Sequence, residues 1–279
     1  MSRAPAATLW LMPGWSYGPD MWQPLCAGLA ATGWSLRLRC PDPGYFRWRS
    51  LSPPDAAFLP EELSAVGGSA QEPAAGGLRL AVGHSLGGLE WLRQAAEQEG
   101  GGTRWDGLVL VNGFVRFSAA TDWPEGVPAR VVERMHRRVC ASEAEAQAVL
   151  ASFRQRCGGN PAASLPGEPQ WTRLAAGLET LRHGDGRIAA HQWPGPVWLL
   201  ASRDDVIVPP ALTCASAAAF PAATVLWREH GGHVLPLSAP AFCVAALRQI
   251  LDSLNAMLSS GGPIPEKGTM PGLYRDGVG

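Results

Sequence analysis

The feature that most constrains this 279-residue chain is a turn, Gly83-His84-Ser85-Leu86-Gly87-Gly88. It directly follows an apolar run, Leu78–Val82, that predicts a buried strand, and it opens a helix that begins near Leu86. A strand-to-helix turn this tight strains the backbone of the serine, and flanking glycines let neighbouring chain pass without a Cβ clash. The turn therefore predicts a serine hydroxyl, that of Ser85, held at the edge of a sheet beside the free N–H groups of a helix start.

Short apolar runs recur along the chain and are bounded by Gly, Pro, Asp or Asn, which is typical of buried strands. Helix-like stretches, such as Met21–Ala31 and Leu86–Glu97, lie between several of them. This alternation predicts an α/β protein with a mostly parallel central sheet and helices on both faces. The predicted strands are Thr8–Met12, Leu36–Arg39, Leu78–Val82, Leu108–Val111, Val197–Ala201 and Thr224–Trp227.

The alternation stops between about Phe117 and His191, where the patterns are helical and no strand is expected. Within this segment Gly158–Pro169 is rich in Gly and Pro and predicts a loop. A helical insertion between two strands predicts a cap over the strand ends. We therefore expect a core formed by residues 1–116 and 192–258, a helical cap at 117–191, and a poorly ordered tail at 259–279. The predicted cap helices are Ala129–Val139, Glu143–Arg156 and Trp171–Leu181.

Composition excludes several classes of protein. With 46% apolar and 17% charged residues the chain is globular, and a net charge of −1 provides no basic field for nucleic acid. No apolar run approaches the roughly 18 residues that span a bilayer, and the N-terminal residues lack the order of a secretory signal. The six cysteines lie far apart, which favours free thiols over a disulfide framework or a zinc site. We expect a cytoplasmic monomer that binds neither nucleic acid nor membrane.

A serine hydroxyl becomes a useful nucleophile only when a base removes its proton and an acid orients that base. In strand-turn-helix sites of this kind the acid follows the serine in the chain, and a histidine follows the acid. The predicted strand Val197–Ala201 leads to Asp204 and Asp205, and a carboxylate at this end of a strand lies at the same sheet edge as the serine. Asp205 is preferred because it stands four residues before Pro209, and Asp204 is expected to be solvated or capping.

The base is expected after the next strand, Thr224–Trp227. His233 follows two glycines in a loop that can curl back towards the serine, so it is preferred over His230, which lies nearer the strand. The H-x-x-H spacing also occurs in metal sites, but the glycines disfavour a regular helix and no further ligand lies near. The residues thus predict acyl transfer through Ser85, His233 and Asp205, with no metal and no organic cofactor.

Acyl transfer also needs hydrogen-bond donors for the negative oxygen that forms on the substrate. One expected donor is the backbone N–H of Leu86, the residue after the serine. The second is expected from the loop Met12-Pro13-Gly14-Trp15-Ser16, in which Gly14 permits a close approach and the Trp15 N–H is our choice.

These residues resemble the α/β-hydrolase superfamily and, more narrowly, the pimeloyl-acyl-carrier-protein methyl ester carboxylesterases of biotin synthesis. The turn at Ser85 carries the broader resemblance, to the superfamily. The narrower one rests on four stretches, Pro13–Ser16 with Met21-Trp22, Gly83–Gly88, Leu174–Leu181 with Asp185 and Arg187, and His233–Pro236 with Pro240–Cys243.

The resemblance implies a serine carboxylesterase with Ser85 as nucleophile, His233 as base and Asp205 as orienting acid, acting on a small acyl ester. Two positions depart from the family pattern, because Pro13 replaces a histidine and His84 stands where tryptophan can occur. Three alternatives stay open, namely a general carboxylesterase or thioesterase, an acyltransferase, and a ligand-binding receptor or scaffold without turnover.

The family's substrate is carried on an acidic carrier protein and enters between cap helices. An acyl pocket at the cap junction would be lined by Phe114, Phe117, Met135 and Phe153. Cap arginines that would dock the carrier are Arg130, Arg134, Arg137, Arg138, Arg154 and Arg156. The alternative is a solvated arginine face, because this chain uses arginine at every basic position except Lys267.

Overall fold

The computed structural model describes residues 6–48, 60–62, 77–97, 105–158 and 165–260. Its main sheet has the strand order β4-β2-β1-β5-β6-β8-β9, and every neighbouring pair is parallel. All six predicted strands are confirmed as members of this sheet. Their bounds are β1 Ala6–Met12, β2 Ser35–Asp42, β5 Leu78–His84, β6 Gly107–Val111, β8 Val197–Ser202 and β9 Ala223–Arg228, and β4 adds Pro60–Glu62.

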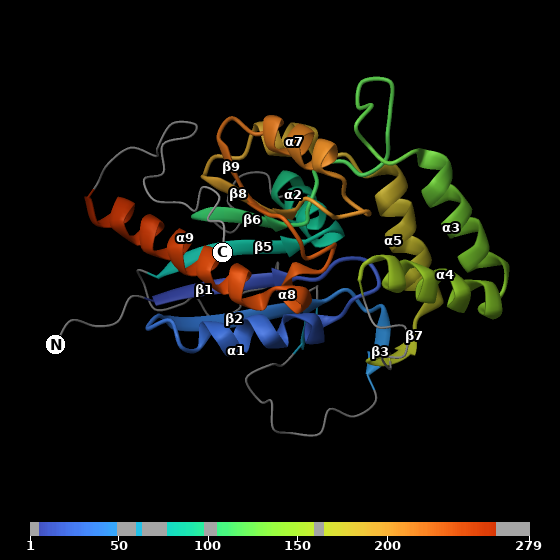
Figure 1. The fold of residues 1–279 in the computed structure, drawn as a ribbon, viewed down its shortest axis with the longest axis horizontal. Coiled ribbons are helices and arrows are strands. Elements are labelled where there is room, and N and C mark those ends of the chain that lie inside the picture. The colour runs from blue at the N-terminus through green and yellow to red at the C-terminus, as the bar shows by residue number, and fades with distance from the viewer. Residues whose placement is uncertain (1–5, 49–59, 63–76, 98–104, 159–164, 261–279) are drawn as a thin grey trace.

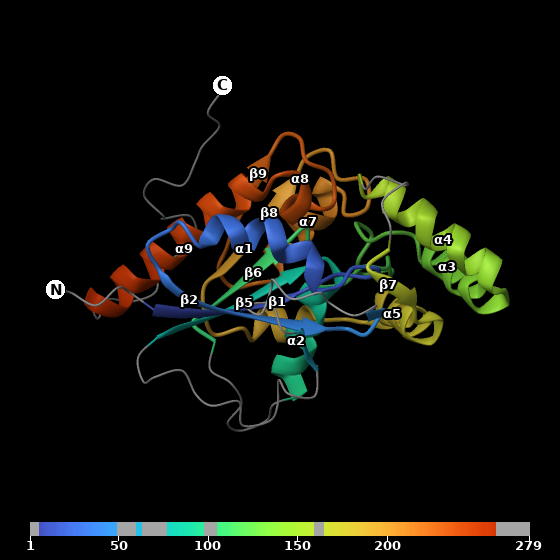
Figure 2. The same cartoon turned by 90° about the horizontal axis from the view of Figure 1, so that it is seen from below.

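Helices cover both faces of the sheet, as predicted. On one face α1 (Gln23–Leu29), which follows the 3-10 turn η1 (Pro19–Trp22), packs beside α9 (Pro240–Ser260) (Figures 1 and 2). On the other face α2 (Leu86–Glu97) packs against β5 and β1. The strands β6 and β8 are buried along their whole length, which explains their continuous apolar runs.

Helix α9 is the one described helix that is long and apolar enough to cross a membrane, contrary to the expectation that no segment would be. Its buried positions recur every three or four residues, so they form one face of the helix. This face packs on α1 and β5 and includes Cys243, Leu247, Ile250, Leu251 and Leu254. The apolar character of α9 is thus used, at least on this face, by the core of the fold.

The segment between β6 and β8 contains the helices α3 (Ala129–Ala141), α4 (Glu143–Arg156), α5 (Trp171–His183) and α6 (Arg187–His191). Helices α3, α4 and α5 lie beyond the carboxyl ends of the strands (Figure 1), whereas α6 packs against α2. Helix α3 packs against both α4 and α5. The start of α4 is capped by Ser142, whose hydroxyl accepts the N–H of Glu145.

The expectation of a segment without strands is wrong at three residues. β7 (Gly167–Pro169) pairs antiparallel with β3 (Phe46–Trp48), at the end of the region predicted to be a loop. Three residues containing Gly and Pro show no alternation, and their partner lies far away in the chain, so no local pattern announces this strand. The tail was predicted to begin at residue 259, but α9 continues through Ser260, and residues 261–279 lie outside the described part of the chain.

The remaining elements position the loops at the carboxyl edge of the sheet. Helix α7 (Pro210–Ala218) packs against β8 and β9. The short helix α8 (Leu235–Ser238) lies between β9 and α9, immediately after the loop with the predicted histidine. The loops after β1, β5, β6, β8 and β9 all leave the sheet at this edge, and α4 and α5 make hydrogen bonds with the loop after β1.

Candidate active site

Ser85 stands at the sharp turn between β5 and α2. Its φ of 52° lies in the left-handed region, which is unfavourable for a serine, so the predicted backbone strain is confirmed. A Cβ on Gly83 would lie 2.4 Å from the backbone nitrogen of Gly88, so only glycine lets the strand and the helix pass this closely. The N–H of Ser85 donates to the carbonyl of Val111 at 3.0 Å, which ties the turn to β6.

His233 lies against Ser85 at the centre of the site. Its Nε2 is 3.0 Å from Ser85 Oγ, and its Nδ1 is 2.8 Å from Oδ2 of Asp205. The ring and the carboxylate are both almost completely buried, at 1% and 3% exposure of the residue. A carboxylate only accepts, so Nδ1 carries the proton, and Nε2 is left to accept the O–H of Ser85.

The carboxylate of Asp205 is held on both oxygens. Oδ1 accepts the N–H groups of Ile207 at 2.8 Å and Val208 at 2.9 Å, and Oδ2 also accepts the amide of Asn112 at 2.9 Å. Burial by itself would raise the pKa of Asp205, but the charge and hydrogen bond of His233 and the two N–H groups outweigh it and lower the pKa. Asp205 is therefore ionised at neutral pH despite its burial.

The neighbouring candidates Asp204 and His230 lie outside this chain of contacts. Asp204 was expected to be solvated or capping, and it is exposed, with a carboxylate that accepts the N–H of Gly231 at 3.1 Å and of Gly232 at 2.8 Å. Burial works against these bonds, yet together with the Ser202 hydroxyl they lower the pKa of Asp204 to about 2. His230 is exposed and lies 3.5 Å from Asp204. Asp204 thus anchors the loop that carries His233.

The loop after β1 lies directly against Ser85. A Cβ on Gly14 would be 2.9 Å from the Cβ of Ser85, so the predicted close approach is confirmed. Within the described residues, neither the N–H of Trp15 nor that of Leu86 donates a hydrogen bond, so both are free to bind a substrate oxygen. The indole N–H of Trp15 donates to the carbonyl of Leu174 in α5, which fixes this loop to the cap.

Arg154 makes a second connection between the cap and this loop. From α4 its Nη1 donates to the carbonyl of Ser16 at 2.6 Å, and its guanidinium lies 4.7 Å from the centre of the Tyr17 ring. Ser16 has a left-handed φ of 69°, so the accepting carbonyl belongs to a strained residue next to Trp15. Arg154 therefore braces the loop, and it differs from the surface arginines with which it was grouped.

His84 is fully buried beneath the site. Its Nε2 is 2.8 Å from the carbonyl of His233, and a carbonyl only accepts, so Nε2 must carry the proton. Burial, followed by the nearby charge of His233, lowers the pKa of His84 to about 3. His84 is consequently a neutral donor that supports the backbone of the histidine loop.

The four residues predicted to line an acyl pocket fall into separate places. The ring of Phe153 packs edge-on against Trp15, with 4.8 Å between the ring centres, and its centre lies 6.4 Å from that of the His233 ring. Phe153 therefore borders the site. Phe114 and Phe117 are buried and pack on each other, and Met135 of α3 is half-buried against the core.

The other predicted docking arginines lie on the surface of the cap. Arg130, Arg134 and Arg137 of α3 have no hydrogen-bond or ion-pair partner within the described residues. Arg138 pairs with Glu145, and Arg156 donates to the carbonyl of Val206 at 3.4 Å. Arg154, which is hydrogen-bonded to the loop after β1, thus differs from the other arginines, which lie on the surface.

Asn112 was not among the site residues predicted from the sequence. It follows β6 directly, as Asp204 and Asp205 follow β8, so the same argument about strand ends would have placed its side chain at the site. The bracing role of Arg154 had no such signal, because its partner lies 138 residues away and is a backbone carbonyl.

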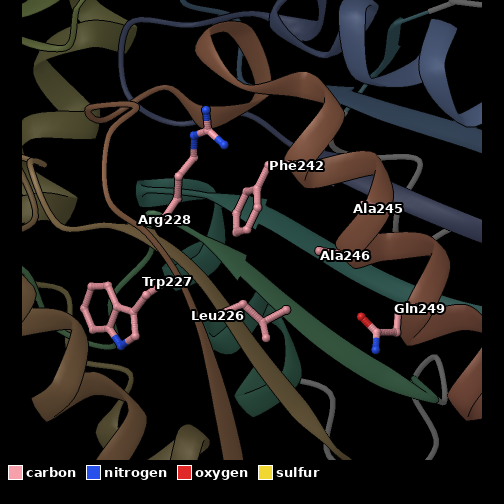
Figure 3. A pocket seen from close by; sticks show the side chains of 7 residues that line it. All are labelled: Leu226, Trp227, Arg228, Phe242, Ala245, Ala246 and Gln249. Atoms are coloured by element: carbon pink, nitrogen blue, oxygen red, sulfur yellow. The ribbon is translucent and has the colours of Figure 1, made fainter. Parts of the chain in front are cut away.

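A separate pocket of about 260 Å³ lies between β9 and α9 (Figure 3). Its walls contain no nucleophile, acid or base, so it is not an alternative active site. It is lined by Leu226, Trp227, Arg228, Phe242, Ala245, Ala246 and Gln249. Among the described residues no group of three or more His, Cys, Asp or Glu side chains could hold a metal ion.

This fold and a buried Ser-His-Asp contact chain at the strand ends define a class of enzyme. The chain belongs to the alpha/beta hydrolase family, whose model it matches over residues 11–246. The predictions of fold and family are confirmed, and the class of enzyme is confirmed at the level of a hydrolase.

Similar proteins include a pimeloyl-[acyl-carrier protein] methyl ester esterase from Xanthomonas campestris. It is 30% identical over 239 residues, which cover 80% of this chain and 86% of that protein. A protein of the same name from Aromatoleum aromaticum is 28% identical over 261 residues, covering 86% and 96%. An esterase structure from Exiguobacterium antarcticum has a TM-score of 0.70 at 13% identity, covering 90% of this chain and 93% of that one, and supports the fold alone.

Proposed function

We propose that this protein is a serine carboxylesterase in which Ser85, His233 and Asp205 form the catalytic triad. The observation that carries the proposal is the continuous contact from Ser85 Oγ through both nitrogens of His233 to the buried Asp205 carboxylate, at 3.0 and 2.8 Å. A buried carboxylate that orients a histidine beside a strained serine is the arrangement that acyl transfer requires.

In the first half of the reaction, His233 Nε2 takes the proton of Ser85 as Oγ attacks the ester carbonyl. The Nδ1–H stays bonded to Asp205, whose negative charge stabilises the imidazolium that forms. The free N–H groups of Trp15 and Leu86 bind the oxyanion, and losing one such donor typically lowers turnover by about 10²- to 10³-fold. The imidazolium then gives its proton to the leaving alkoxide, which departs as the alcohol.

In the second half, the same ring takes a proton from water, and the resulting hydroxide attacks the acyl group on Ser85. The second tetrahedral intermediate collapses, Ser85 regains its proton from His233, and the carboxylic acid leaves. The chain's own groups supply every proton transfer in this sequence, and the oxyanion donors act in both halves.

The substrate we propose is the pimeloyl-carrier-protein methyl ester, with methanol as the leaving alcohol. Its support is the name shared by relatives that are 28% and 30% identical over most of both chains. The exposed arginines of α3 have no hydrogen-bond or ion-pair partner among the described residues, and such positive charge suits the acidic surface and phosphate linker of a carrier protein. These residues are Arg130, Arg134 and Arg137.

A growth experiment tests this substrate. A biotin-requiring bacterial strain that lacks its own pimeloyl ester esterase receives either the intact gene or the Ser85→Ala variant. Growth without biotin with the intact gene alone is the expected result. Failure of both genes, with soluble protein in both cells, would remove this substrate. A purified protein that still hydrolyses p-nitrophenyl butyrate through Ser85 would then remain a general carboxylesterase.

A further inference from the structure

The side chain of Asn112 contacts the loops that carry both partners of Ser85. Its Nδ2 donates to Oδ2 of Asp205 at 2.9 Å and to the carbonyl of Gly232 at 3.2 Å. Its Oδ1 accepts the N–H of Leu235 at 3.4 Å. One amide group therefore contacts Asp205 and also residues before and after His233 in the sequence, Gly232 and Leu235.

The backbone holds Asn112 at a fixed point of the sheet edge. Its N–H donates to the carbonyl of Leu200 in β8 at 2.7 Å, and the preceding residue, Val111, accepts the N–H of Ser85. Its φ of 47° lies in the left-handed region, which asparagine tolerates better than most residues. The amide thus starts from a point that is joined to both the nucleophile and the strand before the acid.

The Asp205 oxygen that meets His233 has Asn112 as its second donor. Asp205 is only 3% exposed, so water is a poor substitute for the hydrogen bond from Asn112. A hydrogen bond to a charged acceptor is also stronger than one between neutral groups. We propose that Asn112 is a positioning residue, whose amide keeps Oδ2 of Asp205 at Nδ1 of His233. This role rests on the proposed hydrolysis, because the pair matters only if His233 acts as the base.

A merely structural role would consist of holding the histidine loop in place. Asp204 has such a role, because it accepts the N–H groups of Gly231 and Gly232 without touching Asp205 or the His233 ring in any described contact. Asp204→Asn therefore serves as the matched control, since it weakens the same loop by an isosteric change.

The pH dependence of turnover separates the two roles. The other titratable groups that face Asp205 are His84 and Cys157, and burial first of all lowers the pKa of His84 to about 3 and raises that of Cys157 to about 12. Neither changes charge near neutral pH, so the acid limb of the profile reports the His233–Asp205 pair. Asn112→Asp places a second carboxylate beside Asp205, and a like charge at this distance makes the pair bind a proton more tightly.

The experiment measures kcat and KM for p-nitrophenyl butyrate from about pH 5 to 9 in four proteins. They are the native chain, Asn112→Gly, which tolerates the left-handed backbone, Asn112→Asp and Asp204→Asn. We expect Asn112→Gly to lower kcat by about 10- to 100-fold with KM nearly unchanged. Asn112→Asp should lower kcat and move the acid limb upward by about one pH unit. Asp204→Asn should leave that limb in place.

Two results would overturn the proposal. One is an Asn112→Asp profile whose acid limb coincides with those of the native chain and Asp204→Asn. The other is loss of cooperative thermal unfolding in both Asn112 variants, which would make Asn112 a folding residue. The proposed function fails separately, if Ser85→Ala retains native turnover in the same assay.

Discussion

The two sides of the site are held by different kinds of contact. On the core side, the serine, acid and histidine follow the carboxyl ends of β5, β8 and β9 and are joined by buried hydrogen bonds of 2.8 to 3.0 Å. On the cap side, the contacts with the loop after β1 come from single side chains, among them Arg154 on Ser16 and Trp15 on Leu174. The core side is tied to the sheet, whereas the cap side depends on side chains that can be exchanged.

This difference separates two tasks in one enzyme. The sheet edge fixes the reacting groups, so substitutions there should change turnover. Phe153 of the proposed cap lies beside the His233 ring, so we expect substitutions there to change which esters are accepted. Arg154 joins the two sides, because it starts in the cap and holds a strained residue of the core.

The largest expected effect comes from removing the acid on the core side. Asp205→Asn replaces an acceptor by a group that can donate to His233 Nδ1, which favours the wrong tautomer. We expect kcat for p-nitrophenyl butyrate to fall on the order of 10⁴-fold with a small change in KM. Asp204→Asn is the matched control and should lose far less. Equal losses in the two variants would break the assignment of Asp205 as the acid.

A smaller effect is expected where the cap braces the core. Arg154→Ala removes a charged donor from Ser16 and frees the loop with the Trp15 N–H, so kcat should fall about 10-fold. Arg156→Ala is the control, because Arg156 is exposed and its contact with Val206 is long. Steady-state kinetics of both variants make the test. A native kcat in Arg154→Ala would show that the cap does not position the oxyanion donor.

Buried His84 predicts a pH effect on stability. Its pKa in the folded protein is about 3, below the ordinary 6.5, so between these values the unfolded chain binds a proton that the folded one does not. The free energy of unfolding therefore loses nothing through His84 above about pH 6.5. Below that pH, His84 lowers it by up to about 1.4 kcal/mol per pH unit. Urea unfolding of His84→Gln should lack this part of the slope, and exposed His230→Gln should keep it. Identical slopes in both variants would contradict it.

The smallest effect is expected on the cap surface. Exchange of Arg130, Arg134 and Arg137 for glutamine should change kcat/KM for p-nitrophenyl butyrate by less than about twofold, because exposed side chains away from the triad contribute little to turnover. If the face docks a carrier protein, the same variant should lose about 10-fold on a carrier-linked methyl ester and become less sensitive to salt. Equal rates of the native and variant proteins on both esters would show that these arginines form a solvated surface and do not dock a carrier protein.

Much of the fold and of the candidate site could be predicted from the sequence, for physical reasons. Strands buried on both faces appear as continuous apolar runs, and the glycines around Ser85 mark a turn that few other residues can form. Asp205 and His233 were predicted because each follows a strand end. The strand β7 and the brace from Arg154 were not, because they depend on partners far away in the chain that no local pattern reveals.

The most direct test of the account is the site at which a fluorophosphonate reacts with the intact protein, mapped by peptide mass spectrometry. We expect a single adduct, on the hydroxyl of Ser85, that forms at least about 10³-fold more slowly in His233→Ala because the base is missing. An adduct on another residue, or ester hydrolysis that continues after Ser85 has been fully modified, would contradict the proposed role of Ser85.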